Sequence, residues 1–308
     1  MRIAAMAAGA VGGYFGARLA AAGHDVFFIA RGANLAAIKA NGLKIESVHG
    51  DLHLPKVNVT DNPQDVGPVD VVLFAVKLWD TEAAAELTKP LVNDATRVIT
   101  LQNGVDSVER IAPILGTGQS VGGVTYIATT IAAPGVIRHT SAFARMVFGR
   151  ADGKADATLD AFLAAGKAAN LAFEMAADIT RERWQKFIFL TAMSGSTATF
   201  RSSIGPIAAD PELRDFFRQL MEEAYAVGRA RGAALDHAFI DDRMAQIEGK
   251  IEPGMKASMA HDLERGNRLE LDWLSGKVAA LGRELGVPTP ASDTVCKVLK
   301  LHRSGTAG

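Results

Sequence analysis

The stretch Arg2–Arg31, RIAAMAAGAVGGYFGARLAAAGHDVFFIAR, decides the fold of this chain. A short apolar run over residues 3–6 leads into a turn of small residues, and an alanine-rich helical segment follows. Gly23 ends that segment, and a second apolar run covers residues 26–29. A strand, a glycine turn, a helix and a strand within about thirty residues are the plan of a dinucleotide-binding βαβ unit. The sequence therefore predicts an N-terminal Rossmann-type domain.

The turn between the first strand and the helix predicts where a pyrophosphate binds. Gly9 lets the backbone approach the phosphates, Gly12 lets helix and strand pack closely, and the helix N-terminus offers free N–H groups. A plain strand–helix turn is the alternative, but the two flanking strand-like runs favour a dinucleotide site. Ala7 stands where the G-x-G-x-x-G pattern has its first glycine, so either the turn accepts a β-carbon at negative φ or phosphate binding is weakened. The expected cofactor contacts in this turn are Ala7, Ala8, Gly9, Ala10, Val11 and Gly12.

Residues at three predicted strand ends indicate which dinucleotide binds. An acid usually ends the second strand of NAD-binding folds, whereas an arginine suits the 2′-phosphate of NADP, and this chain has Arg31 there. Lys77 ends the apolar run over residues 69–76, and Asn103 follows the strand-like run over residues 97–101. Ligands collect at the carboxyl ends of strands in open α/β sheets, although a solvated lysine and an Asn-Gly turn are the alternatives. The sequence thus predicts NADP (NADPH) as the cofactor.

The composition is that of a soluble globular enzyme with two domains. The 308 residues are 48% hydrophobic and 22% charged, and 33 lysines and arginines nearly cancel 34 acids. The formal net charge of −1 gives no basic field for nucleic acid or for an acidic membrane surface. Cys296 is the single cysteine, which excludes an internal disulfide and indicates a reducing compartment. With no targeting or membrane-spanning run and no histidines at ligand spacing on one helix, we expect a cytoplasmic protein without a metal.

The periodicity changes near residue 180, from alternating strands and helices to one helix after another. We therefore expect an α/β dinucleotide-binding domain over residues 1–178 and an all-helical domain over residues 179–308. A homodimer is expected as well, because an apolar helical domain can bury a self-complementary face.

A lysine lies in the helical segment of residues 181–200, which is apolar around most of its circumference and should form a central buried helix. Because an unpaired buried ammonium is costly, Lys186 requires an explanation. Lys186, Leu190 and Ser194 are spaced four apart and share one helix face. If that face lines an interdomain cleft, Lys186 can act as general acid toward a carbonyl oxygen while a nicotinamide supplies hydride. The alternative is a lysine that snorkels to the helix edge.

A second polar stretch is SMAHDLERGNRLELD, Ser258–Asp272. Most of its charges fit a solvated helix face. Glu270 differs, because residues 269, 271 and 273 around it are apolar, which predicts a carboxylate at a buried edge. We expect Trp273 and Leu274 to lie in the long helix that follows.

These residues, in this order and spacing, resemble the ketopantoate reductase (2-dehydropantoate 2-reductase) family over nearly the full chain. The matching pieces are AGAVGGYFGARLAAAGHDV, FAVKLWD, LQNGVD, PGVIRHTS, WQK, SMAHDLERG and LELDWLSG. The resemblance implies a Rossmann domain and a helical domain like the C-terminal domain of 6-phosphogluconate dehydrogenase, meeting at a cleft. It also implies that NADPH reduces a 2-oxo acid to a 2-hydroxy acid. That acid is ketopantoate, which gives pantoate in pantothenate biosynthesis, or a different 2-oxo acid in a paralogue.

The resemblance also assigns cofactor contacts. Arg31 and Lys77 are implied to bind the 2′-phosphate side of NADP. Asn103 is implied to lie at the nicotinamide ribose and the substrate, and Ala128 to contribute a backbone contact.

For catalysis, the resemblance implies that Lys186 is the proton donor and that Glu270 lies near the cofactor ribose and the reacting groups. Ser258 matches a serine that binds the substrate carboxylate, and Asp262 matches a family aspartate of the same segment. The expected substrate contacts are Asn103, Lys186, Ser194 and Ser258.

Four positions depart from the family pattern. Leu190 and Ser194 stand where the family usually has asparagines, Leu269 replaces a threonine, and Ser275 replaces an asparagine. Ser194 can still donate a hydrogen bond, whereas Leu190 cannot, and a buried substrate hydroxyl facing leucine loses about 1–3 kcal/mol. We therefore expect the reaction to be retained and the substrate pocket to be altered.

Two other functions stay open at this point. A 3-hydroxyacid dehydrogenase shares the two-domain plan, but that class commonly has an asparagine where this chain has Leu190. A non-catalytic NADP-binding sensor is favoured by Leu190 and Ala7, and it is disfavoured by the retention of both Lys186 and Glu270.

Overall fold

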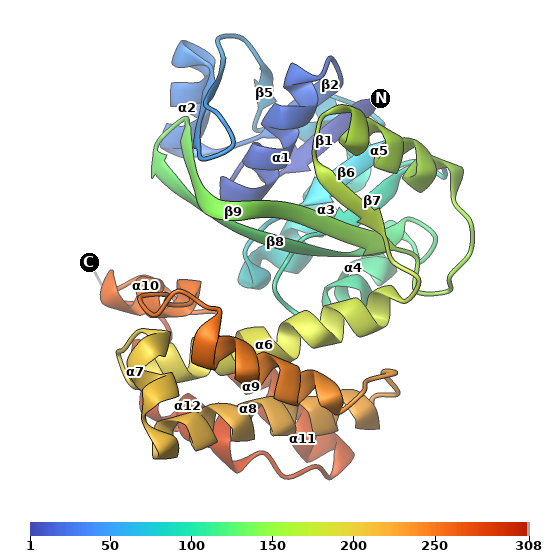
Figure 1. The fold of residues 1–308 in the computed structure, drawn as a ribbon. Coiled ribbons are helices and arrows are strands. Elements are labelled where there is room, and N and C mark those ends of the chain that lie inside the picture. The colour runs from blue at the N-terminus through green and yellow to red at the C-terminus, as the bar shows by residue number, and fades with distance from the viewer. Residues whose placement is uncertain (307–308) are drawn as a thin grey trace. The chain divides into compact units, whose positions relative to one another are not determined.

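The structure is a computed structural model that describes residues 1–306 (Figure 1). The described chain divides into two compact units. The first comprises Met1–Gln102 and Asp106–Ile179, and the second comprises Asn103–Val105 and the chain from Thr180 onward. The short segment 103–105 thus belongs with the helices by its contacts, although it precedes the expected boundary after residue 178 in the sequence.

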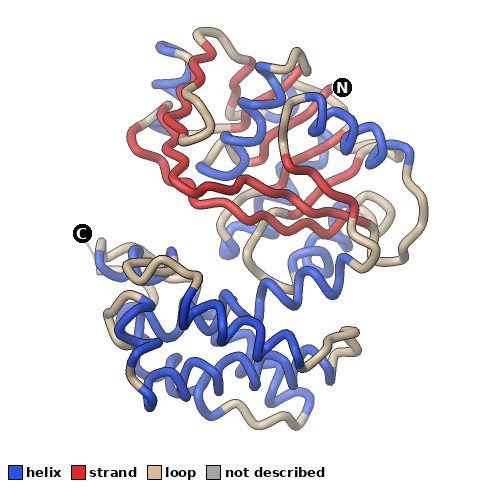
Figure 2. Tube along the Cα trace, in the orientation of Figure 1, coloured by secondary structure: helices blue, strands red, loops and turns tan. Residues whose placement is uncertain are grey.

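One ten-stranded sheet forms the centre of the first unit. Its order is β4-β3-β9-β8-β7-β6-β1-β2-β5, and β10 pairs with β9. The strands, red in Figure 2, are β1 (Arg2–Met6), β2 (Asp25–Ile29), β3 (Leu43–Ser47), β4 (Leu52–Leu54), β5 (Asn58–Thr60), β6 (Val71–Phe74), β7 (Arg97–Thr100), β8 (Ser120–Ala133), β9 (Val136–Gly149) and β10 (Ala172–Met175). From β8 through β7, β6, β1 and β2 to β5, every pair of neighbours is parallel, whereas β8 and β9 form an antiparallel hairpin. Every residue of β6 is buried, as expected for a parallel strand covered on both faces.

Two segments of the sheet differ from what their sequence patterns predict. The alternation over residues 43–59, with Gly50-Asp51 inside it, predicts one antiparallel hairpin, but β3 and β4 alone form the hairpin and β5 pairs with β2. Residues 136–140 and 145–148 each read as a short strand, but they belong to one continuous strand, β9. Its partner β8 continues over the same length, and the resulting ladder holds β9 together across the register shifts near residues 127–129.

Glycines let the first helix lie close to the sheet. A β-carbon on Gly16 would meet the Phe28 ring at 2.8 Å, and one on Gly13 would meet Ile137 at 2.4 Å. The helices of this unit are α1 (Ala10–Ala21), α2 (Gly32–Asn41), α3 (Thr81–Thr88), α4 (Ser107–Leu115) and α5 (Ala157–Ala168). Short 3-10 turns are η1 (Pro63–Asp65), η2 (Leu78–Asp80) and η3 (Lys89–Leu91).

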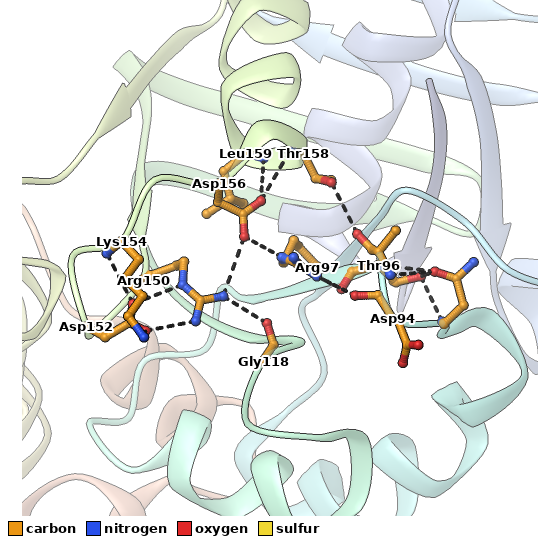
Figure 3. Close-up of polar contacts among 12 residues, drawn as sticks. Asp94, Thr96, Arg97, Gly118, Arg150, Asp152, Lys154, Asp156, Thr158 and Leu159 are labelled. Carbon is orange, nitrogen blue, oxygen red and sulfur yellow. Dashed lines mark hydrogen bonds and ion pairs between the residues drawn. The ribbon is translucent and has the colours of Figure 1, made fainter.

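A polar network around Asp156 joins α5 to the beginning of β7 (Figure 3). The Asp156 carboxylate accepts hydrogen bonds from the backbone N–H groups of Thr158 (3.1 Å) and Leu159 (3.2 Å), so it caps α5. It also pairs with Arg97 Nε at 2.5 Å and with Arg150 Nη1 at 3.5 Å. Because the Asp156 side chain is 4% exposed, these bonds are made away from bulk water.

The second unit consists of helices, and α6 contributes to its buried core. Its elements are α6 (Ile179–Thr199), α7 (Ile204–Ala209), α8 (Pro211–Ala230), α9 (Ala238–Gly249), α10 (Ser258–Glu264), η4 (Leu271–Trp273), α11 (Ser275–Leu285), α12 (Pro290–Leu299) and η5 (Lys300–His302). Residues of α6 such as Phe187, Ile188 and Ala192 are buried in its core. The expected α/β domain followed by an all-helical domain is therefore confirmed. Within the described residues, no helix has both the length and the apolar character needed to cross a membrane.

One boundary in the helical unit was predicted wrongly. Trp273 belongs to η4 and Leu274 precedes α11, so neither lies in the long helix. The backbone of Leu274 has φ −104° and ψ −103°, which is not helical and separates the two elements.

Replacing Asp156 tests the polar network. Asp156→Ala should lower the free energy of unfolding by about 1–3 kcal/mol, because it removes a helix cap and leaves Arg97 without its buried partner. Chemical denaturation measures this change. Asp152→Ala is the matched control, since that carboxylate pairs with Arg150 at the surface and should leave stability nearly unchanged. Equal stability of the two variants would contradict this account of the network.

Candidate active site

The turn between β1 and α1 has an open backbone. Gly9 is the N-cap of α1 (φ −82°, ψ −165°), and among the described residues no side chain caps the helix and no acid lies in its first turn. A β-carbon on Gly9 would meet none of the described atoms within 4 Å. The free N–H groups of a twelve-residue helix therefore face accessible space, an arrangement that fits a phosphate.

The rest of the turn is shaped by close packing. A β-carbon on Gly12 would lie 2.4 Å from Ala7 O and 3.2 Å from Ala75 Cβ, so this position requires glycine. Among the non-glycine residues of the described chain, only Asn170 and Arg201 have a positive φ, so Ala7 does not. The backbone at Ala7 is thus compatible with a β-carbon, which is the first of the two alternatives stated for this turn.

One residue of the turn is less available than expected. The N–H of Ala8 donates to Ile29 O at 2.8 Å, and the carbonyl of Ala8 accepts from Asn34 Nδ2 at 3.0 Å. Both backbone groups of Ala8 are therefore engaged within the fold. The open N–H groups lie further on, in the first turn of α1.

Two cations follow the strands that flank β1. Because the sheet order is β6-β1-β2, the ends of β2 and β6 lie on either side of the end of β1. Arg31 follows β2, its side chain is 77% exposed, and it lies 3.9 Å from an Asp80 oxygen. Lys77 follows β6, is exposed, and has its ammonium 5.5 Å from the centre of the Trp79 ring. Both charges are placed to attract a phosphate near the turn.

In the second unit, three sequence-predicted residues lie together. Lys186 on α6 is half-buried, and its Nζ donates to Asn103 Oδ1 at 3.0 Å. Burial lowers the pKa of Lys186 to about 8, against the opposing effect of the Glu270 carboxylate, which favours the charged form. Glu270 itself is only 6% exposed. A lysine, an amide and a buried carboxylate from three separate stretches of sequence thus form one cluster.

The protonation state of Lys186 suits a proton donor. With a pKa of about 8, the amine is mostly charged at neutral pH, yet it gives up its proton more readily than an ordinary lysine. Cys296 shows the contrast, because burial raises the pKa of its thiol to about 11 and keeps it protonated. Among the described residues, no group of histidines, cysteines and acids could hold a metal ion.

Other predicted site residues are not part of this cluster by any described contact. Ser194 is fully buried, and within the described chain its Oγ has no hydrogen-bond partner. Ser258 is exposed at the start of α10, and Asp262 accepts a hydrogen bond from Asn267 at 3.1 Å. Ala128 is exposed in β8, where its N–H already donates to Ser141 Oγ at 2.9 Å. The N–H of Ala128 is therefore engaged within the hairpin and is not available for the backbone contact that the resemblance implies.

A further cation, Arg183, lies beside the cluster and was not among the residues predicted from the sequence. Arg183 lies one turn before Lys186 on α6 and is 7% exposed. Its Nη2 donates a short hydrogen bond to the carbonyl of Val105, two residues after Asn103. The sequence shows only that Arg183 is a further cation near Lys186 on the same predicted helix; its partner, a backbone carbonyl, leaves no pattern in the sequence.

A dinucleotide-type α/β unit, followed by a helical unit with a buried lysine beside an amide and a carboxylate, defines a two-domain dehydrogenase. The sequence matches the family Ketopantoate reductase PanE/ApbA over residues 3–153, and the C-terminal part of that family over residues 178–303. The chain belongs to this ketopantoate reductase family and is an oxidoreductase of that type. A nicotinamide dinucleotide is the cofactor that this class and the open turn indicate.

Full-length relatives agree with this assignment. A 2-dehydropantoate 2-reductase of Mesorhizobium japonicum is 32% identical, with 97% of each chain covered. An uncharacterized oxidoreductase of Bacillus subtilis, YkpB, is 29% identical over 99% of both chains. The crystal structure of a PanE/ApbA family ketopantoate reductase from Ralstonia eutropha superposes with a TM-score of 0.89 at 33% identity, covering 98% of each chain.

The glycine turn can be tested directly. Gly12→Ala should weaken binding of the nicotinamide dinucleotide by about tenfold or more, because its β-carbon would displace the carbonyl of Ala7 and distort the turn. Fluorescence titration measures the dissociation constant. Gly118→Ala is the control, since its β-carbon would meet none of the described atoms within 4 Å. An unchanged dissociation constant in Gly12→Ala would contradict the placement of the phosphates.

Proposed function

We propose that this protein uses NADPH to reduce a 2-oxo acid to the corresponding 2-hydroxy acid. The observation that carries the proposal is the Lys186 ammonium, which has a lowered pKa and is hydrogen-bonded to Asn103 close to the Glu270 carboxylate. A reductase of a carbonyl group needs a proton donor at the oxygen, and this ammonium is suited to that task.

The roles of the chain's own residues follow from these contacts. When bound, NADPH supplies the hydride that adds to the carbonyl carbon. Lys186 gives a proton to the carbonyl oxygen as negative charge develops there. Asn103 Oδ1 accepts one N–H of Lys186 and so fixes the direction of the ammonium, while Glu270 stabilises its charged form. Ser258 and Ser194 remain predicted contacts of the substrate.

NADPH is proposed over NADH on the charges beside the glycine turn. Arg31 stands at the end of β2, where NAD-binding folds usually carry an acid, and Lys77 adds a second cation at the end of β6. Two cations favour a terminal phosphate through charge-assisted hydrogen bonds.

The substrate is proposed to be a 2-oxo acid whose side chain is more apolar than that of ketopantoate, with ketopantoate as the alternative. Leu190 lies one turn beyond Lys186, is half-buried against the helical core, and offers no hydrogen bond to a hydroxyl group. Leu269, next to Glu270, is fully enclosed. The homodimer and the cytoplasmic location expected from the sequence remain predictions.

A panel of 2-oxo acids tests the substrate. NADPH oxidation is followed with ketopantoate and with acids of matched size that carry alkyl or aryl side chains, and NADH is run in parallel. We expect the highest kcat/KM for an apolar acid with NADPH, because a site that pairs no hydroxyl favours substrates without one. A clear preference for ketopantoate would overturn the apolar assignment while leaving the reaction class intact.

The proton donor is tested by substitution. Lys186→Ala should lower kcat by about two to four orders of magnitude, the usual contribution of a positioned general acid, and should leave the NADPH dissociation constant within a few-fold of its value. Stopped-flow and steady-state assays measure both quantities. Lys297→Ala, at an exposed position of α12, serves as the control and should be fully active. Full activity of Lys186→Ala would refute the assignment.

The lowered pKa predicts a pH profile. Reduction requires the charged form of Lys186, so kcat/KM should be constant below pH 8 and should fall tenfold per pH unit above it. In Lys186→Arg the guanidinium stays charged, so the remaining activity should lose this basic limb. A wild-type profile that stays flat to pH 10 would contradict the lowered pKa.

A further inference from the structure

We propose that Arg183 is a positioning residue that holds Asn103 in place for Lys186 by anchoring the main chain at Val105. The proposal rests on the proposed role of Lys186 as proton donor. It is carried by two hydrogen bonds that run from one face of α6 to one three-residue segment.

Helix α6 directs two side chains to the same short segment. Arg183 and Lys186 are three residues apart on a continuous α-helix, so their side chains emerge from neighbouring positions of one face. Both reach the segment 103–105, which clusters with the helices and not with the sheet that precedes it in sequence. Arg183 Nη2 donates to the carbonyl of Val105, and Lys186 Nζ donates to Asn103 Oδ1 at 3.0 Å. The segment is therefore held at both ends by the same helix.

The segment 103–105 needs an anchor because its middle residue is a glycine. Gly104 lies between the two bonded residues and has no side chain with which to restrict its backbone. The Val105 side chain is 6% exposed and packs in the helical core, so Val105 is fixed both by its side chain and by its carbonyl. With Val105 fixed, only the short Asn103–Gly104 stretch can adjust, and the Asn103 amide stays within reach of Lys186.

Arg183 is a buried residue and not a surface one. The residue is 7% exposed, and a guanidinium taken out of water requires acceptors of good geometry. The carbonyl of Val105 is one such acceptor. A longer-range consequence follows for Lys186. If Asn103 moves away, the ammonium loses a hydrogen bond to its charged form, so the pKa of Lys186 should fall.

The test is a double-mutant cycle on kcat. Arg183→Met should lower kcat by about 10- to 100-fold, the effect of misplacing a catalytic group by about an ångström. In the Asn103→Ala background, the same substitution should cause at most about a twofold further loss, because the group that Arg183 positions is already absent. Losses that multiply in the double variant would overturn the proposal.

A matched control separates positioning from stability. Glu223→Gln weakens another buried anchor of the same unit, since Glu223 accepts hydrogen bonds from Ala291 N at 2.6 Å and from Ser292 N at 2.8 Å. The effects of Glu223→Gln and Asn103→Ala on kcat should be independent, so that their fold-losses multiply in the double variant. Glu223→Gln should also leave the basic limb of the pH profile near pH 8. Arg183→Met should move that limb to lower pH. A limb that stays in place in Arg183→Met would show a structural role only.

A crystal structure of Arg183→Met tests the positioning role without an activity assay, because it gives the distance between Lys186 Nζ and Asn103 Oδ1 directly. We expect the Lys186 Nζ–Asn103 Oδ1 distance to exceed about 3.5 Å, the limit of a hydrogen bond. A distance unchanged at 3.0 Å would overturn the positioning role whether or not the protein reduces any 2-oxo acid. If the wild-type protein turns over no 2-oxo acid, the proposed function fails and this distance alone decides the role of Arg183. Should Arg183→Met fail to fold, Arg183→Gln, which keeps a neutral N–H donor of shorter reach, is used for the same measurements.

Discussion

The burial of one ammonium group is the constraint on which the helical unit depends. Lys186 lies on α6, which contributes many residues to the buried helical core, and burial of a charge is costly unless partners offset it. Asn103 accepts a hydrogen bond from the ammonium, and the negative charge of Glu270 opposes the effect of burial on the pKa, which at about 8 leaves the amine mostly protonated at neutral pH. Because its pKa is lowered, the Lys186 amine releases its proton more readily than a solvated lysine does. The burial that makes the ammonium costly to accommodate in the folded protein is therefore also what makes it useful as an acid.

The partners of this ammonium come from distant parts of the chain. Asn103 arrives just after β7 of the sheet, and Glu270 arrives just before η4 of the helical unit. The segment 103–105 is grouped with the helices because Arg183, Lys186 and the core around Val105 hold it there. The first unit carries the uncapped N–H groups of α1 and two exposed cations, Arg31 and Lys77, which we propose bind a phosphate of the cofactor. One unit thus offers rigid backbone donors, and the other offers a single tuned side chain.

Local sequence patterns predicted the architecture and most of the cluster. Apolar runs between glycine turns correctly predicted the parallel strands, and a charge inside an apolar helix drew attention to Lys186. Patterns of this kind carry no information on which distant segments pair. For that reason the pairing of β5 with β2, the continuity of β9 and the start of α11 only after Leu274 were not foreseen. Arg183 was missed for the same reason, because its partner is a backbone carbonyl that has no signature in the sequence.

The account depends most directly on the charge state of Lys186. Selective labelling with ¹⁵N-lysine allows each side-chain nitrogen to be followed by NMR as the pH is raised, and the spectrum of Lys186→Arg assigns the signal. The structure predicts one nitrogen that titrates near pH 8 and is missing from the variant. A Lys186 nitrogen that shows no titration near pH 8 would contradict the account.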